Sequence, residues 1–192
     1  MNTPAHLLIG AAVFGKVNQK GTTIAALFGA LTPDLSLYVM VSASIWVLNI
    51  SPAIVFDELY FSDAWQRVFA IDNSFILWGL ACAVAVWRRS AIFTAFTAAA
   101  LLHLALDFPS HTDDARMHFW PVTNWVFESP VSPVSYWDRR AYAGVVGPFE
   151  VTLSCGAAFL IWRRNEPRLI MVIAAFLLAA DILSSGIWQF IF

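Results

Sequence analysis

Residues 101–121 read LLHLALDFPSHTDDARMHFWP and hold three of the four histidines and three of the thirteen acidic residues of the chain. The run that leads into them, residues 90–108, is almost uncharged and is long enough to cross a membrane as a helix. His103 and Asp107 stand four positions apart near its end, so a helix places both on one face. The stretch therefore predicts a transmembrane helix with a polar pair where it leaves the bilayer.

The residues after this helix predict a sharp turn followed by a short second helix. Pro109 ends the first helix, because proline lacks an amide hydrogen and clashes with the preceding turn. Ser110 or Thr112 can cap the short helix, with acidic residues in its first turn. The turn and the short helix add nitrogen and oxygen donors at helical spacing, namely His111, Asp113, Asp114 and His118.

The composition is that of an integral membrane protein. Hydrophobic residues make up 59% and charged residues 12%, against about a quarter charged in soluble domains. The length of 192 residues predicts a single membrane-embedded domain. A net charge of −2 gives no sign of a basic surface that would bind nucleic acid. Cys82 and Cys155 lie in apolar runs without a Cys or His cluster, so we expect buried small hydrophobic residues.

The hydropathy pattern predicts an all-α fold, a polytopic helical bundle of about five to six transmembrane helices. A short helix is expected in a long outer loop, residues 109–143. Residues 51–73 read as a mixed loop, and Thr32-Pro33-Asp34 interrupts the second apolar run. The apolar runs, of which the first and third are short, are 6–14, 22–49, 74–87, 90–108, 144–162 and 169–192.

The basic residues predict an orientation. Those near the ends of the apolar runs fall in alternate turns, which the positive-inside rule places in the cytoplasm. The loops at 50–73 and 109–143 then face the periplasmic or extracellular side. If the first short helix re-enters instead of crossing, His6 changes sides. The basic residues are Lys16, Lys20, Arg88, Arg89, Arg163, Arg164 and Arg168.

Depth estimates place the ionisable residues of the apolar runs in the outer half of the bilayer. At about 1.5 Å per residue, Asp34 lies roughly 18 Å outward from Thr22, and Glu150 lies roughly 9 Å inside the outer end of its run. Asp181 lies roughly 20 Å outward from Arg168, and His6 starts its helix at the outer face. Such groups are costly in hydrocarbon, so we expect one shared polar pocket.

The histidines and aspartates suit a Zn²⁺, Mn²⁺ or Fe²⁺ site with open positions. The alternative for His103 and Asp107 is a hydrogen-bonded pair that fixes the end of a helix. His118 is equally a surface histidine beside Trp120, and His6 is equally an interface residue.

The remaining acidic residues have alternatives of their own. Asp34 is either functional or a helix cap. Glu150 is either a general base or a structural anchor. Asp113 fits a solvated helix start, and Asp181 fits a hydrogen bond to Ser184 or Ser185.

Three short motifs in order resemble a known family. They are TPAH at residues 3–6 followed by Gly10, GALTPD at 29–34, and HLALD at 103–107. They resemble the YdjM-like family of bacterial inner-membrane proteins, described as membrane-bound metal-dependent hydrolases. The family often has a further acid after Pro-Asp-Leu, where this chain has Ser36. The resemblance covers roughly the first 120 residues and implies a metal site made of His6, Asp34, His103 and Asp107; His111 and His118 are added from spacing alone.

We therefore expect a hydrolase with a divalent metal ion, zinc or manganese, near the outer surface of the bacterial inner membrane. Glu150 or Asp114 would accept a proton from the metal-bound water. The position suggests a phosphoester of a lipid or lipid-linked substrate, with its phosphate held by arginines of the outer loop (Arg116, Arg139 and Arg140).

The alternative is a non-enzymatic membrane protein, either a small transporter or a scaffold, with an intramembrane His/Asp/Glu cluster. In that case Asp34, Glu150 and Asp181 would line an ion path along the membrane normal. A metal site would instead require several donors to converge on one point.

Overall fold

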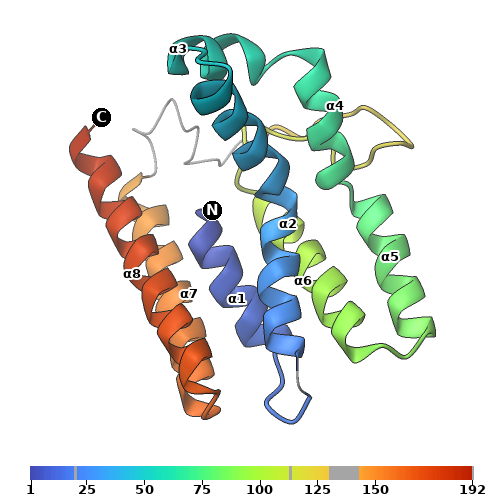
Figure 1. The fold of residues 1–192 in the computed structure, drawn as a ribbon, viewed down its shortest axis with the longest axis vertical. Helices are drawn as coiled ribbons and strands as arrows, with labels where there is room; N and C mark the ends of the chain where they lie inside the picture. The colour runs from blue at the N-terminus through green and yellow to red at the C-terminus, as the bar shows by residue number, and fades with distance from the viewer. Residues whose placement is uncertain (20, 113, 130–142, 192) are drawn as a thin grey trace.

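The computed structural model describes residues 1–19, 21–112, 114–129 and 143–191, the last range with its side chains from 147 to 184. These residues form helices and turns without a strand, which confirms the all-α prediction (Figure 1). Two π-helical segments, Ala43–Val47 and Val55–Leu59, continue α2 and α3. The helices are α1 (Thr3–Phe14), α2 (Thr22–Ser42), α3 (Pro52–Ile54), α4 (Asp63–Asp72), α5 (Phe75–Trp87), α6 (Ala91–Asp107), α7 (Ala143–Arg163) and α8 (Arg168–Ile191).

The short helix α1 lies at the centre of the fold. On one side it packs against the antiparallel pair α7 and α8, and on the other side against α2 and α6, with α5 outside α6 (Figure 1). The contact with α7 and α8 is aliphatic and consists of Leu8, Ala11, Ala12, Ala157, Ile161, Ile170 and Ala174.

Small residues let α1, α2 and α6 approach closely. A Cβ added to Gly29 of α2 would lie 1.9 Å from the backbone oxygen of Phe96 in α6, so only glycine fits there. A Cβ on Gly10 of α1 would lie 2.9 Å from the Cβ of Ala30. The next turn of the same three helices carries polar residues, namely His6, Asp34 and His103.

Helix α2 runs unbroken through Thr32-Pro33-Asp34, so the predicted interruption is wrong. Proline removes one hydrogen bond of the helix, but neighbouring groups in a helical bundle can satisfy the backbone that it frees. The carbonyl that loses its amide partner to Pro33 is that of Gly29. Side chains bond two other carbonyls of this segment: Asn73 Nδ2 donates to the Pro33 carbonyl at 3.3 Å, and the Thr32 hydroxyl donates to the Phe28 carbonyl at 2.7 Å.

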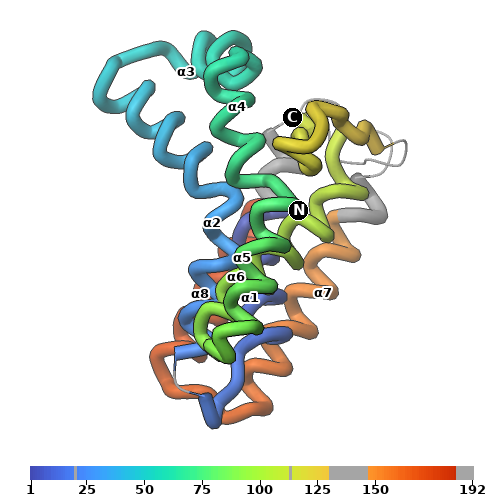
Figure 2. Tube along the Cα trace, turned by 90° about the vertical axis from the view of Figure 1, so that its right-hand side faces the viewer, coloured from blue at the N-terminus to red at the C-terminus, as the bar shows by residue number. Residues whose placement is uncertain are grey.

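Residues 51–73 are largely helical, so the mixed loop predicted there is also wrong. Ser51 and Ser62 each accept a hydrogen bond from the backbone amide three residues later and so cap α3 and α4. The end of α2, α3 and α4 together rise above the level at which α1 begins (Figures 1 and 2).

The short helix predicted after Pro109 does not form, because the described residues 109–129 adopt turns and extended backbone. The two hydroxyls expected to cap it are used elsewhere. Ser110 Oγ donates back to the Leu106 carbonyl at 3.0 Å, and Thr112 Oγ1 donates to the Ser129 carbonyl at 2.9 Å. Asp113, predicted to be a solvated residue at the helix start, lies outside the described residues. Arg139 and Arg140, predicted to hold a phosphate, also lie outside them.

Two helical stretches of the described chain, Thr22–Val47 and Asp63–Trp87, are long and apolar enough to cross a membrane. Core helices of soluble proteins can pass the same test, and α1 and α6 are apolar but shorter. The turns α1–α2, α5–α6 and α7–α8 lie together at one end of the molecule (Figure 1). Cys155 is exposed and Cys82 is partly exposed, contrary to the prediction that both are buried.

Candidate metal site

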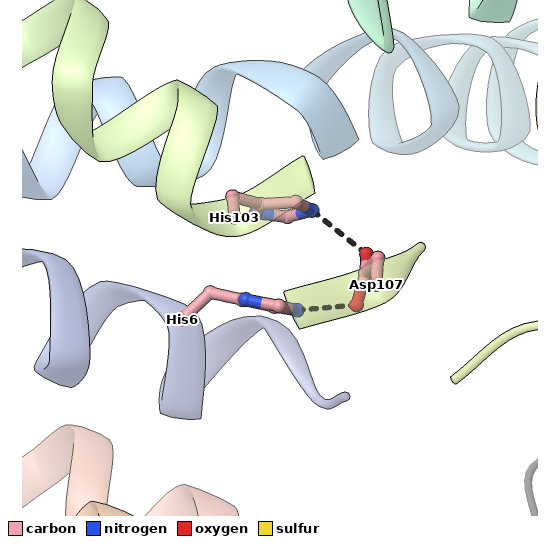
Figure 3. A group of neighbouring side chains, drawn as sticks. All are labelled: His6, His103 and Asp107. Carbon is pink, nitrogen blue, oxygen red and sulfur yellow. Dashed lines mark hydrogen bonds and ion pairs between the residues drawn. The ribbon is translucent and has the colours of Figure 1, made fainter. Parts of the chain in front are cut away.

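Helices α1 and α6 bring together a buried group of three residues, His6, His103 and Asp107, which we call the metal group (Figure 3). One donor atom from each lies within 4.8 Å of the others. His6 Nε2 is 2.8 Å from Asp107 Oδ1, and His103 Nε2 is 3.0 Å from Asp107 Oδ2. The two imidazole rings stack with their centroids 3.8 Å apart, so both edges point at the same carboxylate.

The backbone of α2 fixes the proton of His103. Its Nδ1 lies 2.7 Å from the Ala30 carbonyl, which can only accept, so Nδ1 carries the hydrogen. A neutral ring then presents the lone pair of Nε2 to Asp107 Oδ2 and to Asp34 Oδ1, the latter at 3.6 Å. A lone pair that faces carboxylate oxygens is repelled unless a proton or a cation lies between them.

In each of the two buried histidines, one ring nitrogen has no hydrogen-bond partner among the described residues. His103 Nε2 makes no hydrogen bond of good geometry despite its short distance to Asp107, and His6 Nδ1 has no partner. Buried polar atoms without partners are rare and need an explanation such as a bound ion. The arrangement therefore calls for a proton or a cation between His103 Nε2 and the carboxylates.

Asp34, on α2, lies beside the metal group on its partly exposed side. Its side chain is 23% exposed, whereas the side chains of His6 and His103 are 0% exposed. Thr3 Oγ1 donates to Asp34 Oδ2, and the Tyr38 hydroxyl lies 2.7 Å from the same Thr3 oxygen. Such hydrogen bonds orient the carboxylate of a metal site.

His111 borders the metal group as an ion-paired residue. Its Nδ1 is 2.8 Å from Asp114 Oδ1, and its Nε2 is 3.3 Å from Asp107 Oδ1. Burial lowers the pKa of His111, but the two carboxylates outweigh it and raise the pKa to about 9. Burial raises the pKa of Asp114, but the hydrogen bond and charge of His111 outweigh it and lower that pKa. Both ring nitrogens face carboxylates, which suits an imidazolium better than a metal ligand.

The structure places His118 outside the metal group, at the joint between α4 and α5. Its Nδ1 lies 2.9 Å from the Asn73 carbonyl, and its own carbonyl accepts from the Phe75 amide at 2.8 Å. The ring packs against Phe75 and Phe108, and burial lowers its pKa. These contacts give His118 a structural role.

Glu150 and Asp181 are buried on α7 and α8, on the other side of α1 from α6. Glu150 Oε1 accepts from the backbone amide of Asn2 at 2.6 Å. Ser184 Oγ, expected to bond the Asp181 carboxylate, donates instead to the Asp181 backbone carbonyl at 2.9 Å; the Ser185 side chain lies outside the described part. The predicted single pocket thus divides into two groups on opposite faces of α1.

Arg116 is engaged within the fold. Its Nη2 donates to the Tyr60 hydroxyl at 2.5 Å, and its guanidinium lies 4.1 Å from the ring centroid of Phe69. These contacts anchor the outer loop to the segment around α4.

Sequence reasoning missed four residues of the site: Thr3, Ala30, Tyr38 and Met1, whose amino group lies 3.0 Å from Asp107 Oδ1. The hydrogen bond of His103 uses a backbone carbonyl, which leaves no trace in residue type. A signal did exist for Tyr38, because it stands four residues after Asp34 and so shares its helix face.

Comparison with known proteins returned no match: no family model, no curated protein and no solved structure is similar to this chain. The resemblance to the YdjM-like family therefore stays a prediction, and the function rests on the geometry of the site.

Proposed function

We propose that this chain is a membrane-bound metal-dependent hydrolase whose divalent ion is held by His6, His103 and Asp107. The observation that carries the proposal is the position of His103 Nε2. It lies 3.0 Å from Asp107 Oδ2 and 3.6 Å from Asp34 Oδ1, while the opposite nitrogen donates to Ala30. Two imidazoles and a carboxylate that leave positions open are the ligand set of catalytic zinc and of several other divalent metal sites.

Zinc or manganese is the ion that this ligand set suits best, and Asp34 is placed to complete it. Bound there, the ion would lower the pKa of a water molecule and polarise the scissile bond. Asp34 would bring a second carboxylate from α2, held by Thr3. Asp114 or Glu150 would accept the proton of that water.

We further propose that the chain spans the bacterial inner membrane several times, with the metal group toward the outer surface. Of the apolar windows in Thr22–Val47 and Asp63–Trp87, only 28% is buried, which favours lipid-facing helices over core helices. The 21 residues of α7 and the 24 of α8 also suffice to cross about 30 Å of hydrocarbon. Six basic residues lie at or beside the turns at one end of the molecule, which fits the positive-inside rule: Lys16, Arg88, Arg89, Arg163, Arg164 and Arg168.

The open side of the metal group favours a lipid or lipid-linked phosphoester as substrate. Beyond Asp34, the outward residues of α2 are exposed and mostly apolar, with Leu35 46%, Tyr38 48% and Val39 58% exposed. An acyl chain can lie against such a surface while its phosphate approaches Asp34 and the metal group.

The arrangement supports an enzyme over an ion path. Asp107 and Glu150 both contact the first two residues of the chain, and Asp34 contacts Thr3. These carboxylates therefore gather at the level where α1 begins. An ion path would instead distribute them along the membrane normal.

The test is metal analysis of the purified full chain in lipid nanodiscs. We expect about one zinc or manganese ion per chain and loss of most of it in His103→Ala, because a ligand is removed. His118→Gln is the matched control, since it changes a buried histidine outside the metal group and should keep the ion. Circular dichroism verifies that both variants fold.

Hydrolysis of a fluorescent short-chain phosphatidic acid then tests the reaction. We expect turnover that disappears with a chelator and returns with the metal. A folded wild-type chain that binds no metal, or a His103→Ala variant that keeps it, would overturn the proposal.

A further inference from the structure

A second group of polar residues lies in the seam between α7 and α8. The two helices are antiparallel, and Ala157 and Ile161 of α7 share one buried cluster with Ile170 and Ala174 of α8, which indicates a register of Ile161 with Ile170 and Ala157 with Ala174. Continuing this register toward the start of α7 brings Glu150 opposite Asp181. The charge of Asp181 acts on Glu150, which agrees with this placement of the two carboxyl groups. The aliphatic seam therefore ends in a pair of acids, which we call the acid pair.

The acid pair is buried and incompletely bonded. Glu150 is 4% exposed and Asp181 is 0% exposed. Both carboxylate oxygens of Asp181 lack a hydrogen-bond donor, as does the buried hydroxyl of Ser154, one helical turn from Glu150 on the same face. Two acceptors that face each other need a hydrogen atom or a cation between them.

Two groups face Glu150 from the α1 side. The Asn2 backbone amide donates to it at 2.6 Å, and the Met1 ammonium attracts its charge, although the hydrogen bond of that ammonium goes to Asp107 Oδ1 at 3.0 Å. No lysine, arginine or histidine side chain among the described residues bonds to either acid. Two adjacent buried carboxylates cannot both stay ionised without a large cost, so one of them retains a proton.

We propose that Glu150 and Asp181 form a proton-binding site, separate from the metal group, in which the two carboxyl groups share one proton. The ionised member accepts a hydrogen bond from the protonated one, which satisfies the Asp181 oxygen that faces Glu150. The charge of the acid pair is then −1 instead of −2.

The acid pair is within reach of the metal group. Glu150 Oε1 and Asp107 Oδ1 bond to the backbone nitrogens of residues 2 and 1 at 2.6 and 3.0 Å. Consecutive backbone nitrogens are at most about 3.7 Å apart, so the two oxygens are no more than about 9 Å apart. If the proposed hydrolase function holds, Asp181 is a positioning residue that sets whether Glu150 can take up a proton from the reacting water.

Infrared spectroscopy of the full chain in nanodiscs with a chelator tests the acid pair without metal or turnover. Wild type at neutral pH should show a protonated-carboxyl band that shifts in D₂O. Glu150→Gln and Asp181→Asn should each remove that component, because the amide supplies a permanent donor and the remaining acid ionises. Glu166→Gln is the control, since this buried glutamate already accepts a hydrogen bond from Thr23 at 3.1 Å.

Three results would overturn the proposal: no such band in wild type, a band that survives in both variants, or a second Mg²⁺ or Mn²⁺ ion per chain that Asp181→Asn removes. The last result would make the acid pair a metal site. Failure of the proposed hydrolase function is a separate outcome, because a chain that binds no metal can still show the band.

Discussion

The single hydrogen bond from His103 Nδ1 to Ala30 determines what the metal group can do. It orients the ring and directs Nε2 at the two carboxylates. Zinc-binding histidines commonly use their second nitrogen in this way. The same helix pair thus supplies the ligand and the group that orients it.

Thr3 should tune metal affinity through Asp34. Thr3→Val keeps the shape but removes the hydroxyl that donates to Asp34. We expect metal affinity to fall about 10-fold, as is typical for such outer contacts, when measured by competition with a chromophoric chelator. Thr152→Val is the control, because that hydroxyl bonds only the Pro148 carbonyl. Equal affinity in wild type and Thr3→Val would show that Asp34 takes no part in binding.

The pair of His111 and Asp114 should make the stability of the metal-free protein pH-dependent. The pKa of His111 is raised from 6.5 to about 9, so its stabilising contribution is fully present below about pH 6.5 and is lost as the pH rises through about 9. With a chelator present, the melting temperature of wild type should exceed that of His111→Gln at about pH 6, and the gap should shrink by about pH 10. A gap that stays constant with pH would contradict the ion pair.

At the scale of elements, the contact between α2 and α6 positions the metal group. Gly29 touches the backbone of Phe96, and Ala30 and His103 lie on the adjacent turns. Close backbone approach through small residues is a common way for membrane helices to pack. Separating these helices would move Asp34 away from His103.

Gly29→Ala should therefore destabilise the fold and weaken metal binding together. Its Cβ would lie 1.9 Å from the Phe96 oxygen, and the forced shift should cost about 1–3 kcal/mol. Gly79→Ala in α5 is the control, because nothing lies within 4 Å of its added Cβ. That variant should be neutral or more stable by about 0.5–1 kcal/mol. Thermal unfolding and chelator competition measure the two effects, and equal behaviour of both variants would refute the close contact.

At the scale of the molecule, the described chain has a basic end, and the metal group lies away from that end. The basic turns lie beyond the last residues of α1, and Arg164 donates to the Gly15 carbonyl there at 3.1 Å. The metal group lies at the start of α1, whose 12 residues span about 18 Å. The metal group therefore lies partway down the molecule, below the arm formed by α3 and α4 (Figure 2).

Cysteine labelling tests the proposed orientation. In a chain whose native Cys82 and Cys155 are replaced by alanine, Asn18→Cys should react with a membrane-impermeant maleimide only after the cytoplasmic side is opened. Ala64→Cys, near the start of α4, should react in intact cells. Both positions are exposed, so a lack of reaction reports sidedness and not burial. The reverse pattern would invert the orientation and place the metal group toward the cytoplasm.

The sequence alone determined the features that depend on neighbouring residues. A 3.6-residue period places His103 and Asp107 on one face, and the apolar composition predicts helices throughout. Local rules failed where distant groups intervene. Pro33 stays within α2, where Asn73 of the distant α4–α5 joint bonds its carbonyl, and His118 is held at that joint by Asn73 and Phe75.

Only the tertiary structure decided which donors meet. His6 and Asp34 reach His103 and Asp107 because Gly10, Gly29 and Ala30 let three helices approach at one depth. Glu150 has a similar depth in the sequence but lies on the other side of α1 from α6, since α1 packs between α7 and α6. Depth along a helix follows from residue number, whereas the direction that a side chain faces depends on the packing of neighbouring helices.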